Sequence, residues 1–175
     1  MSSLRLSAWI LGAVLLFWAV GAYNRLVRLR NEIVARFAPV DEHLLERHLQ
    51  LQRQMEAVGS ALAQATERLE ALRAACLQTD SARAHARAHP GAPGAITSLR
   101  LADDILAEAR ARLPVQSIGG LDLSSLNAEL AASDTALEFA RRSFNAAVEE
   151  YNHAVRQVPT RVIAAIFGFA PAGIL

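Results

Sequence analysis

The chain has 175 residues, about the size of one domain, and 53% of them are hydrophobic although only 6% are aromatic. Much of the apolar excess is alanine, a strong helix former with little side chain to bury, so we expect long, thin helices rather than a large core. The 18 basic and 17 acidic residues nearly cancel, which gives no basis for expecting a nucleic-acid partner. The single cysteine excludes an internal disulfide and a zinc site made of several thiolates.

Residues 4–23 are predicted to form a transmembrane anchor. Leu6 to Ala22 is a run of 17 residues without a charge, and with its flanking residues it gives roughly 30 Å of helix, enough to cross the hydrocarbon core. Trp9 and Trp18 lie near the two ends of this run and Tyr23 follows it, as is typical of aromatic residues at the headgroup level.

The alternative for this segment is a secretory signal peptide with Val20-Gly21-Ala22 as its cleavage site. A signal peptide usually runs into an extended cleavage region. Here a helical apolar stripe continues through Leu26, Ile33 and Phe37 without a break. The continuity of this stripe favours a retained anchor.

The charges on either side of the span predict its orientation. Arg5 precedes the span, whereas Glu32 is the one acid among four arginines that follow it: Arg25, Arg28, Arg30 and Arg36. The positive-inside rule therefore places the body in the cytoplasm, as a single-pass protein of the inner membrane. Membrane lipid is an expected contact of these arginines, and a solvated basic face fits them equally well.

The body, residues 24–158, is predicted to contain four helices, at about residues 24–37, 40–86, 98–112 and 123–157. Pro39 is expected to end the first of them. Thr97 or Ser98 is expected to cap the third, after the loop 87–98 with its prolines and glycines, and Asp122 or Ser124 the fourth. Residues 159–175 form a short apolar tail, too short to span a bilayer, which would cap the bundle or lie in the membrane interface.

Two of these helices carry apolar seams spaced alternately four and three residues. The seam of 40–86 runs from Leu44 through His48 to Cys76, a coiled-coil-like period that requires a partner of similar length. The same alternation runs along 123–157. The predicted fold is therefore all-α, with an N-terminal transmembrane helix continuing into a long antiparallel up-and-down bundle.

Reactive constellations are scarce in this sequence. It contains no GxSxG, Walker, HExxH or CxxC motif. His85 and His89 have a metal-compatible spacing but lie among arginines without a nearby carboxylate, His48 is expected to pack on its seam, and Cys76 is expected to be a buried, inert thiol. We therefore expect no catalytic residue, no cofactor, no metal and no enzymatic activity.

Two stretches form a recognisable combination with the C-terminus. YNRLVRLRNE, residues 23–32, directly follows the span, and ARRSFNAAVEEYN, residues 140–152, is followed by FGFAP at 167–171. Together they resemble the LemA family of bacterial membrane proteins, in a divergent and shortened form, because residues 46–54 and 113–120 depart from the family pattern. The resemblance implies a long helical bundle with one transmembrane anchor, and it implies no reaction.

Four asparagines lie beside aromatic seam residues in these stretches, and we expect them to form hydrogen bonds that clamp the first helix to the last near the membrane. Arg30 is expected to pair with Glu32 or Glu149. The candidate site comprises the clamp residues and a C-terminal motif: Tyr23, Asn24, Arg30, Asn31, Glu32, Phe144, Asn145, Tyr151 and Asn152, with Pro159, Phe167, Gly168, Phe169 and Pro171.

Two function classes follow from the sequence and the resemblance. The first is a membrane-anchored scaffold or interaction protein of the bacterial envelope, which binds other membrane or envelope proteins through helix surfaces. The second is an accessory regulator that docks onto a membrane enzyme such as a metalloprotease, since the family's genes often neighbour one. The bare apolar seams also allow a homo-oligomer.

Overall fold

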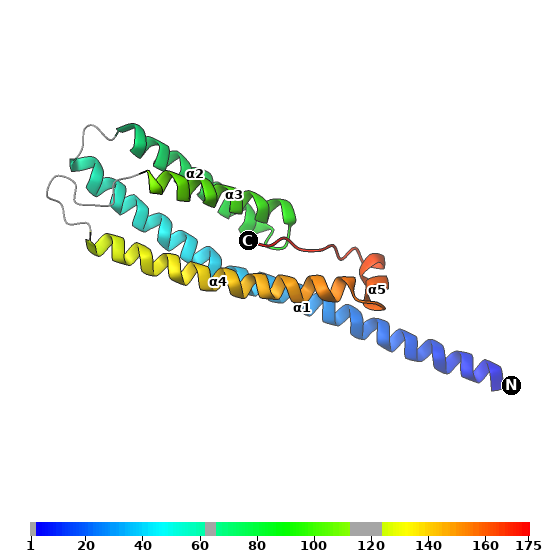
Figure 1. Ribbon diagram of the computed structural model, residues 1–175. Helices are drawn as coiled ribbons and strands as arrows, with labels where there is room; N and C mark the ends of the chain where they lie inside the picture. The colour runs from blue at the N-terminus through cyan, green and yellow to red at the C-terminus, as the bar shows by residue number, and fades with distance from the viewer. Residues whose placement is uncertain (1–2, 62–65, 113–123) are drawn as a thin grey trace.

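The computed structural model describes residues 3–61, 66–112 and 124–175. These contain five α-helices and no strand, which confirms the all-α prediction (Figure 1). The helices are α1 (Ser3–Ala61), α2 (Thr66–Ala88), α3 (Pro93–Ala111), α4 (Ser124–Arg156) and α5 (Thr160–Ile166).

The helix α1 is one unbroken rod of 59 residues, about 88 Å long at 1.5 Å per residue. Its N-terminal part projects beyond the rest of the molecule (Figure 1) and exposes nearly all of its apolar side chains. Among the described residues, α1 alone holds a stretch long and apolar enough to cross a membrane, with a mean hydropathy of 1.9 in a window that is 6% buried. This is compatible with a membrane anchor near the N-terminus.

The prediction that Pro39 ends the first helix is wrong, because α1 continues through it. Proline removes one backbone hydrogen bond and crowds the preceding turn, at a cost of about 3 kcal/mol. Packing on both sides of Pro39 offsets this cost. Phe37 and Val40 are at most 2% exposed, and the Phe37 ring lies edge-on to that of Phe144 on α4, with 5.6 Å between the ring centroids.

The prediction of a single helix over 40–86 is also wrong, because this stretch contributes to both α1 and α2. Figure 1 shows α2 running back beside the C-terminal part of α1. The two halves of the predicted seam therefore pack on each other in one cluster, which includes Leu51 and Met55 from α1 and Leu69 and Leu72 from α2. The seam was predicted to need a helical partner of similar length. That partner is within the same stretch, because its second half, on α2, packs on its first half, on α1.

The third helix begins earlier than predicted, at Pro93 instead of residue 98. Ala92 occupies the N-cap position without a side-chain cap, so Thr97 and Ser98 lie inside the helix. A proline in the first turn suits a helix start because its missing N–H would have no partner there. The helix α4 begins at Ser124, one residue after its predicted start, and the other cap candidate, Asp122, lies outside the described residues.

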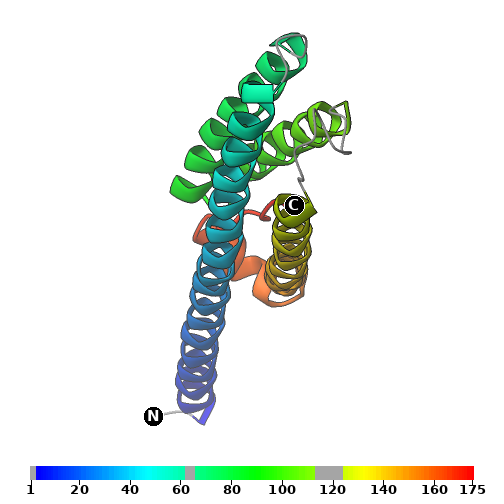
Figure 2. The same ribbon diagram turned by 90° about the vertical axis from the view of Figure 1, so that its left-hand side faces the viewer.

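Successive helices alternate in direction, which gives the predicted up-and-down arrangement (Figures 1 and 2). Contacts pair α1 with α4 and α2 with α3, and α1 also contacts α2. The buried apolar side chains form two clusters. The tail-bound cluster lies between α1 and α4 around Leu26, Phe37 and Phe144, and the hairpin cluster lies around Leu51 and Leu72.

Candidate functional site

The residues singled out from the two ends of the sequence meet at one end of the bundle. Tyr23 on α1 packs against two rings of the C-terminal motif, at centroid distances of 4.9 Å to Phe167 and 5.7 Å to Phe169. The helix α5 brings these rings there by contacting both α1 and α4. The sequence therefore identified residues that lie together, although it did not predict that Tyr23 contacts the tail.

Two asparagines of α4 hold the last residues of the chain. Asn152 accepts a hydrogen bond from the backbone N–H of Ala172 at 2.7 Å and donates one to the carbonyl of the same residue at 3.0 Å. Asn145 forms the same reciprocal pair with Leu175, at 2.9 and 2.8 Å. Each side-chain amide thus pairs with one backbone residue, as a neighbouring strand would, and fixes residues 172–175 along α4.

The expected interhelix clamp is therefore wrong for these asparagines, because their partners belong to the C-terminal segment and not to α1. Asn24 and Asn31 on α1 are exposed, and within the described ranges neither makes a side-chain hydrogen bond. The expected pairing of Arg30 is absent from the same ranges, and Glu32 accepts a hydrogen bond from Arg36 at 2.7 Å instead. An extended segment has free backbone groups for an amide to bind, whereas those of a helix are already paired.

Tyr151 and Gly168 complete the attachment of the tail. The Tyr151 hydroxyl donates to the carbonyl of Ala170 at 3.0 Å. Burial raises the pKa of Tyr151, and the nearby Arg30 guanidinium only partly opposes this effect, so the hydroxyl remains a donor. Gly168 has a φ of +70°, a backbone conformation that side chains disfavour, and it turns the chain from α5 into the tail.

The tail ends against the start of α3. A Cβ atom on Gly173 would lie 2.8 Å from the Pro93 Cα and 3.1 Å from the Ile96 Cβ, so only glycine permits this approach. Of the remaining motif residues, Pro159 directly precedes α5, Pro171 is exposed and Phe144 is fully buried. The C-terminal segment therefore connects α1, α4 and α5 to α3.

A groove of about 440 Å³ adjoins the tail. Arg30 and Tyr151 line one side of it, and the α2–α3 connection with His89 and Pro90 lines another. The rings of His85 and His89 are 5.2 Å apart. Among the residues that the structure describes, no three His, Cys, Asp or Glu side chains gather as a metal site would require.

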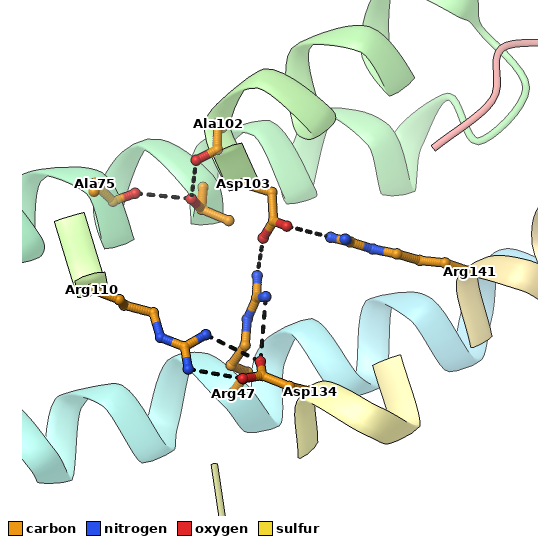
Figure 3. Close-up of polar contacts among 8 residues, drawn as sticks. Arg47, Ala75, Ala102, Asp103, Arg110, Asp134 and Arg141 are labelled. Atoms are coloured by element: carbon orange, nitrogen blue, oxygen red, sulfur yellow. Dashed lines mark hydrogen bonds and ion pairs between the residues drawn. The ribbon is translucent and has the colours of Figure 1, made fainter. Parts of the chain in front are cut away.

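A group of charged side chains that the sequence analysis missed lies in the middle of the bundle (Figure 3). Arg47 on α1 is 7% exposed and donates to Asp103 on α3, which also accepts a 2.6 Å bond from Arg141 on α4. Arg110 on α3 donates to Asp134 on α4 at 2.8 Å. We call these five residues the charged layer.

The charged layer separates the two apolar clusters along the bundle axis. On α1, Arg47 stands between Leu44 of the tail-bound cluster and Leu51 of the hairpin cluster. On α3, Asp103 stands in the same way between Leu99 and Leu106. These positions, three or four residues from apolar neighbours on both sides, are the sequence signal that could have revealed the layer.

The electrostatics of the layer depend on pairing. Burial alone would raise the pKa of the Asp103 carboxyl, but the adjacent Arg47 and Arg141 guanidinium groups lower it below its usual range. Asp103 is therefore held ionised between two cations. On α2, the Thr79 hydroxyl contacts the carbonyls of Ala75 and Ala102 at 2.9 and 3.1 Å, which ties α2 to α3 at the same level.

Cys76 and His48, both assigned to the seam of 40–86, lie in different surroundings. Cys76 is 2% exposed, as expected, and burial raises the pKa of its thiol although Arg47 and Arg110 oppose the shift. His48 is half-buried and bonds Gln52, while the neighbouring Arg47 takes the fully buried position. The described geometry thus offers contact surfaces and paired charges, with Cys76 held as a neutral thiol.

Comparison with known proteins agrees with the sequence pattern. The family model of the LemA family matches residues 22–175, nearly the whole chain, so this chain belongs to the LemA family. A search of curated proteins found no match.

Proposed function

We propose that this LemA-family protein is a non-catalytic scaffold of the bacterial envelope, tethered to the inner membrane. In this proposal the apolar N-terminal part of α1 crosses the bilayer once. The helical bundle stands on the cytoplasmic side, where it binds other membrane or envelope proteins through its helix surfaces.

The observation that carries this proposal is the continuity of α1. One helix of 59 residues supplies both the exposed apolar stretch and the side of the bundle that packs on α4. No loop separates the span from the bundle, since Leu26 and Leu29 are already buried against the body. A helix is stiff over this length, so partners bound to the bundle would be held at a fixed height above the bilayer.

Exposed apolar side chains on the bundle support binding of protein partners. Phe139 on α4 and Leu77 on α2 are 76% and 70% exposed, and Leu101 on α3 is also exposed. In this proposal these side chains are the contact points on the three helices, and a partner would join them into one covered surface.

The membrane tether can be tested with two arginines placed in the apolar stretch, Leu11→Arg and Leu15→Arg together. Each arginine at the centre of a span opposes insertion by about 2.5–3.5 kcal/mol. We expect the double variant to be released from membranes by alkaline carbonate while the native chain stays. The matched control, Ala107→Arg with Ala128→Arg, adds the same charge to exposed bundle positions and should remain in the membrane. Equal retention of both variants contradicts the tether.

The orientation has a separate test. Protease added outside intact spheroplasts should leave the bundle undigested, and digestion of α4 from outside would reverse the proposed topology. Intact-mass analysis of the purified chain also distinguishes an anchor from a signal peptide, because cleavage after Ala22 would leave a chain that begins at Tyr23.

The scaffold role is tested by cross-linking in native membranes followed by purification in mild detergent. Several partners below stoichiometry, or copies of the chain itself, support the scaffold. Recovery of one membrane enzyme in stoichiometric amount, with an activity that changes when the chain is removed, would contradict the scaffold role and support the role of an accessory regulator.

A further inference from the structure

We infer that the bundle end formed by α5 is a second membrane contact, which binds the surface of an anionic bilayer beside the anchor. The contact consists of four exposed apolar side chains and two arginines, here called the α5 surface: Val158, Val162, Ile166 and Phe167 with Arg156 and Arg161. This inference rests on the proposed function, because it takes the apolar part of α1 to lie in lipid.

The height of α5 along α1 places this surface at the membrane boundary. Phe167 packs on Tyr23, which directly follows Leu6–Ala22. Near the end of that stretch, Ala22 belongs to the same cluster as Ile163 and Ala164 of α5, and Ala19 packs against this cluster. Figure 1 shows α5 at the end of the bundle from which α1 emerges. A span that ends near Ala22 therefore brings α5 to the headgroup level.

One side of α5 is apolar and faces away from the bundle. Thr160, Ile163 and Ala164 are buried against the body. Val162 and Ile166, one helical turn apart, are 56% and 69% exposed on the other side. An apolar helix face of this kind at the headgroup level is typical of elements that lie in the bilayer interface.

The charge around the α5 surface complements an anionic bilayer. From Tyr151 to the C-terminus the sequence contains Arg156 and Arg161 and no Asp or Glu, and residues 23–31 add three arginines and no acid. Within the described ranges, neither Arg156 nor Arg161 forms an ion pair. Basic side chains this close to a bilayer are attracted to anionic headgroups.

A groove beside α5 offers these headgroups a place. Its volume is about 510 Å³, and it is lined by Arg156 and Arg161 together with the apolar side chains of Val155, Ala164 and Phe169. Two arginines beside apolar side chains have the chemistry to bind the phosphate and the upper acyl chain of a phospholipid. The anchor and the α5 surface together give the bundle two membrane contacts. Two contacts fix the orientation of the bundle relative to the bilayer, whereas one would allow rotation about the axis of α1.

The test measures the depth of α5 directly in the full chain. A single cysteine is introduced by Ile166→Cys in a Cys76→Ser background, labelled with an environment-sensitive fluorophore, and the protein is reconstituted into nanodiscs of phosphatidylcholine and phosphatidylglycerol. Lipids with a nitroxide near the headgroup should quench this label strongly. Phe139→Cys is the matched control, because Phe139 is a similarly exposed apolar residue about 24 Å away from Val155 along α4.

The two tryptophans separate failure of this inference from failure of the anchor. Trp9 and Trp18 are the only tryptophans of the chain and both lie in the proposed span. In vesicles of the same lipids, which contain no scaffold protein with tryptophans of its own, quenching of their fluorescence by brominated acyl chains therefore reports insertion alone. Quenched tryptophans with quenching at residue 166 equal to that at 139 would overturn the α5 contact and leave the anchor intact. Unquenched tryptophans would overturn both.

The charge requirement is tested by comparing nanodiscs with and without phosphatidylglycerol. We expect severalfold stronger quenching at residue 166 with the anionic lipid. The additional changes Arg156→Gln and Arg161→Gln should remove that difference, because both side chains are exposed and neither forms an ion pair with another described residue. An unchanged preference for anionic lipid in this variant would overturn the role of the two arginines.

Discussion

The two ends of the bundle are held together by different side chains. At the end nearest α5, which contains the tail-bound cluster, aromatic rings and asparagine amides make the contacts. The opposite end, beyond the charged layer, contains the hairpin cluster and is built from aliphatic side chains; we call it the hairpin end. Phe37, Phe144 and Tyr151 belong to the first cluster. Leucines, Met55 and Val58 fill the second, together with Cys76. The contrast teaches that the family pattern marks one half of the bundle, the half that holds the tail, while the divergent residues 46–54 lie at the layer and beyond it.

The two halves also use different means to hold α3. At the tail-bound end, α3 is held partly through the tail, since Gly173 packs on Pro93. At the layer, the long side chains of Arg47 and Arg141 reach Asp103 directly. Replacing a buried ion pair by apolar side chains often leaves stability unchanged, so we expect the layer to act mainly on the register of the helices.

The largest expected effect comes from breaking the charged layer. Asp103→Ala leaves Arg47 buried without its main partner, and a buried charge that loses its partner costs about 3–5 kcal/mol. Thermal unfolding of the full chain in detergent should show a large drop in Tm. Asp104→Ala, at the exposed neighbouring position, is the control and should change Tm little. Equal Tm values would mean that the layer does not hold the two halves together.

The next effect should be confined to the tail-bound end. Asn152→Ala and Asn145→Ala each remove two hydrogen bonds to the tail, with an expected cost of about 1–3 kcal/mol each. Hydrogen exchange should speed up at the N–H groups of Ala172 and Leu175, while the hairpin end keeps its protection. Asn31→Ala, at an exposed position on α1, is the control. Unchanged exchange at the tail amides would contradict the hydrogen bonds between α4 and the tail.

Substitutions at two glycines are expected to change stability in opposite directions, with the larger change no greater than that of one asparagine variant. Gly173→Ala places a methyl group against the start of α3 and should destabilise the tail-bound end by about 1–3 kcal/mol. Gly94→Ala in the first turn of α3 meets no atom within 4 Å and should stabilise slightly, by about 0.5–1 kcal/mol, because alanine is the better helix former. Chemical denaturation of both variants checks the sign. A stabilising Gly173→Ala would show that the tail does not approach α3 closely.

The smallest expected effect is the change with pH in the stability that Asp103 contributes to the charged layer. The folded pKa of Asp103 lies below its unfolded value of about 3.9, so its stabilising contribution is complete above that value and is lost as pH falls through the folded pKa. Asp103→Asn should therefore lower Tm at neutral pH, and its difference from the native chain should shrink as the pH drops below about 4. Asn152→Ala removes no titrating group and should show a nearly constant difference.

Much of the fold followed from spacing along the chain. The alternation of four and three residues predicted helical seams, and the start and end of α4 matched within one residue because a single amphipathic stripe runs between clear breaks. The prediction failed at Pro39 and at the fold-back between α1 and α2. Gly59 and Ser60, poor helix formers just before that reversal, were the available signal.

The sequence predicted which residues belong to the candidate site, but it did not predict which residues they contact. The sequence singled out Asn145, Asn152 and the FGFAP motif, yet it assigned the asparagines to the wrong partner, since spacing shows which face a side chain occupies and not what lies opposite. It missed Arg47 and Asp103 altogether. Their spacing from apolar neighbours was the available signal, but spacing does not show which distant helix supplies the partner of a charge.

The sequence by itself determined the helices, the apolar stretch near the N-terminus and the family, because these depend on residues near one another in the chain. The tertiary structure decided that the long seam folds back on itself, that charges divide the core, and that the tail lies along α4. These features depend on contacts between residues far apart in sequence, such as Arg47 with Asp103 and Tyr23 with Phe167, whose free energy exists only once the helices pack.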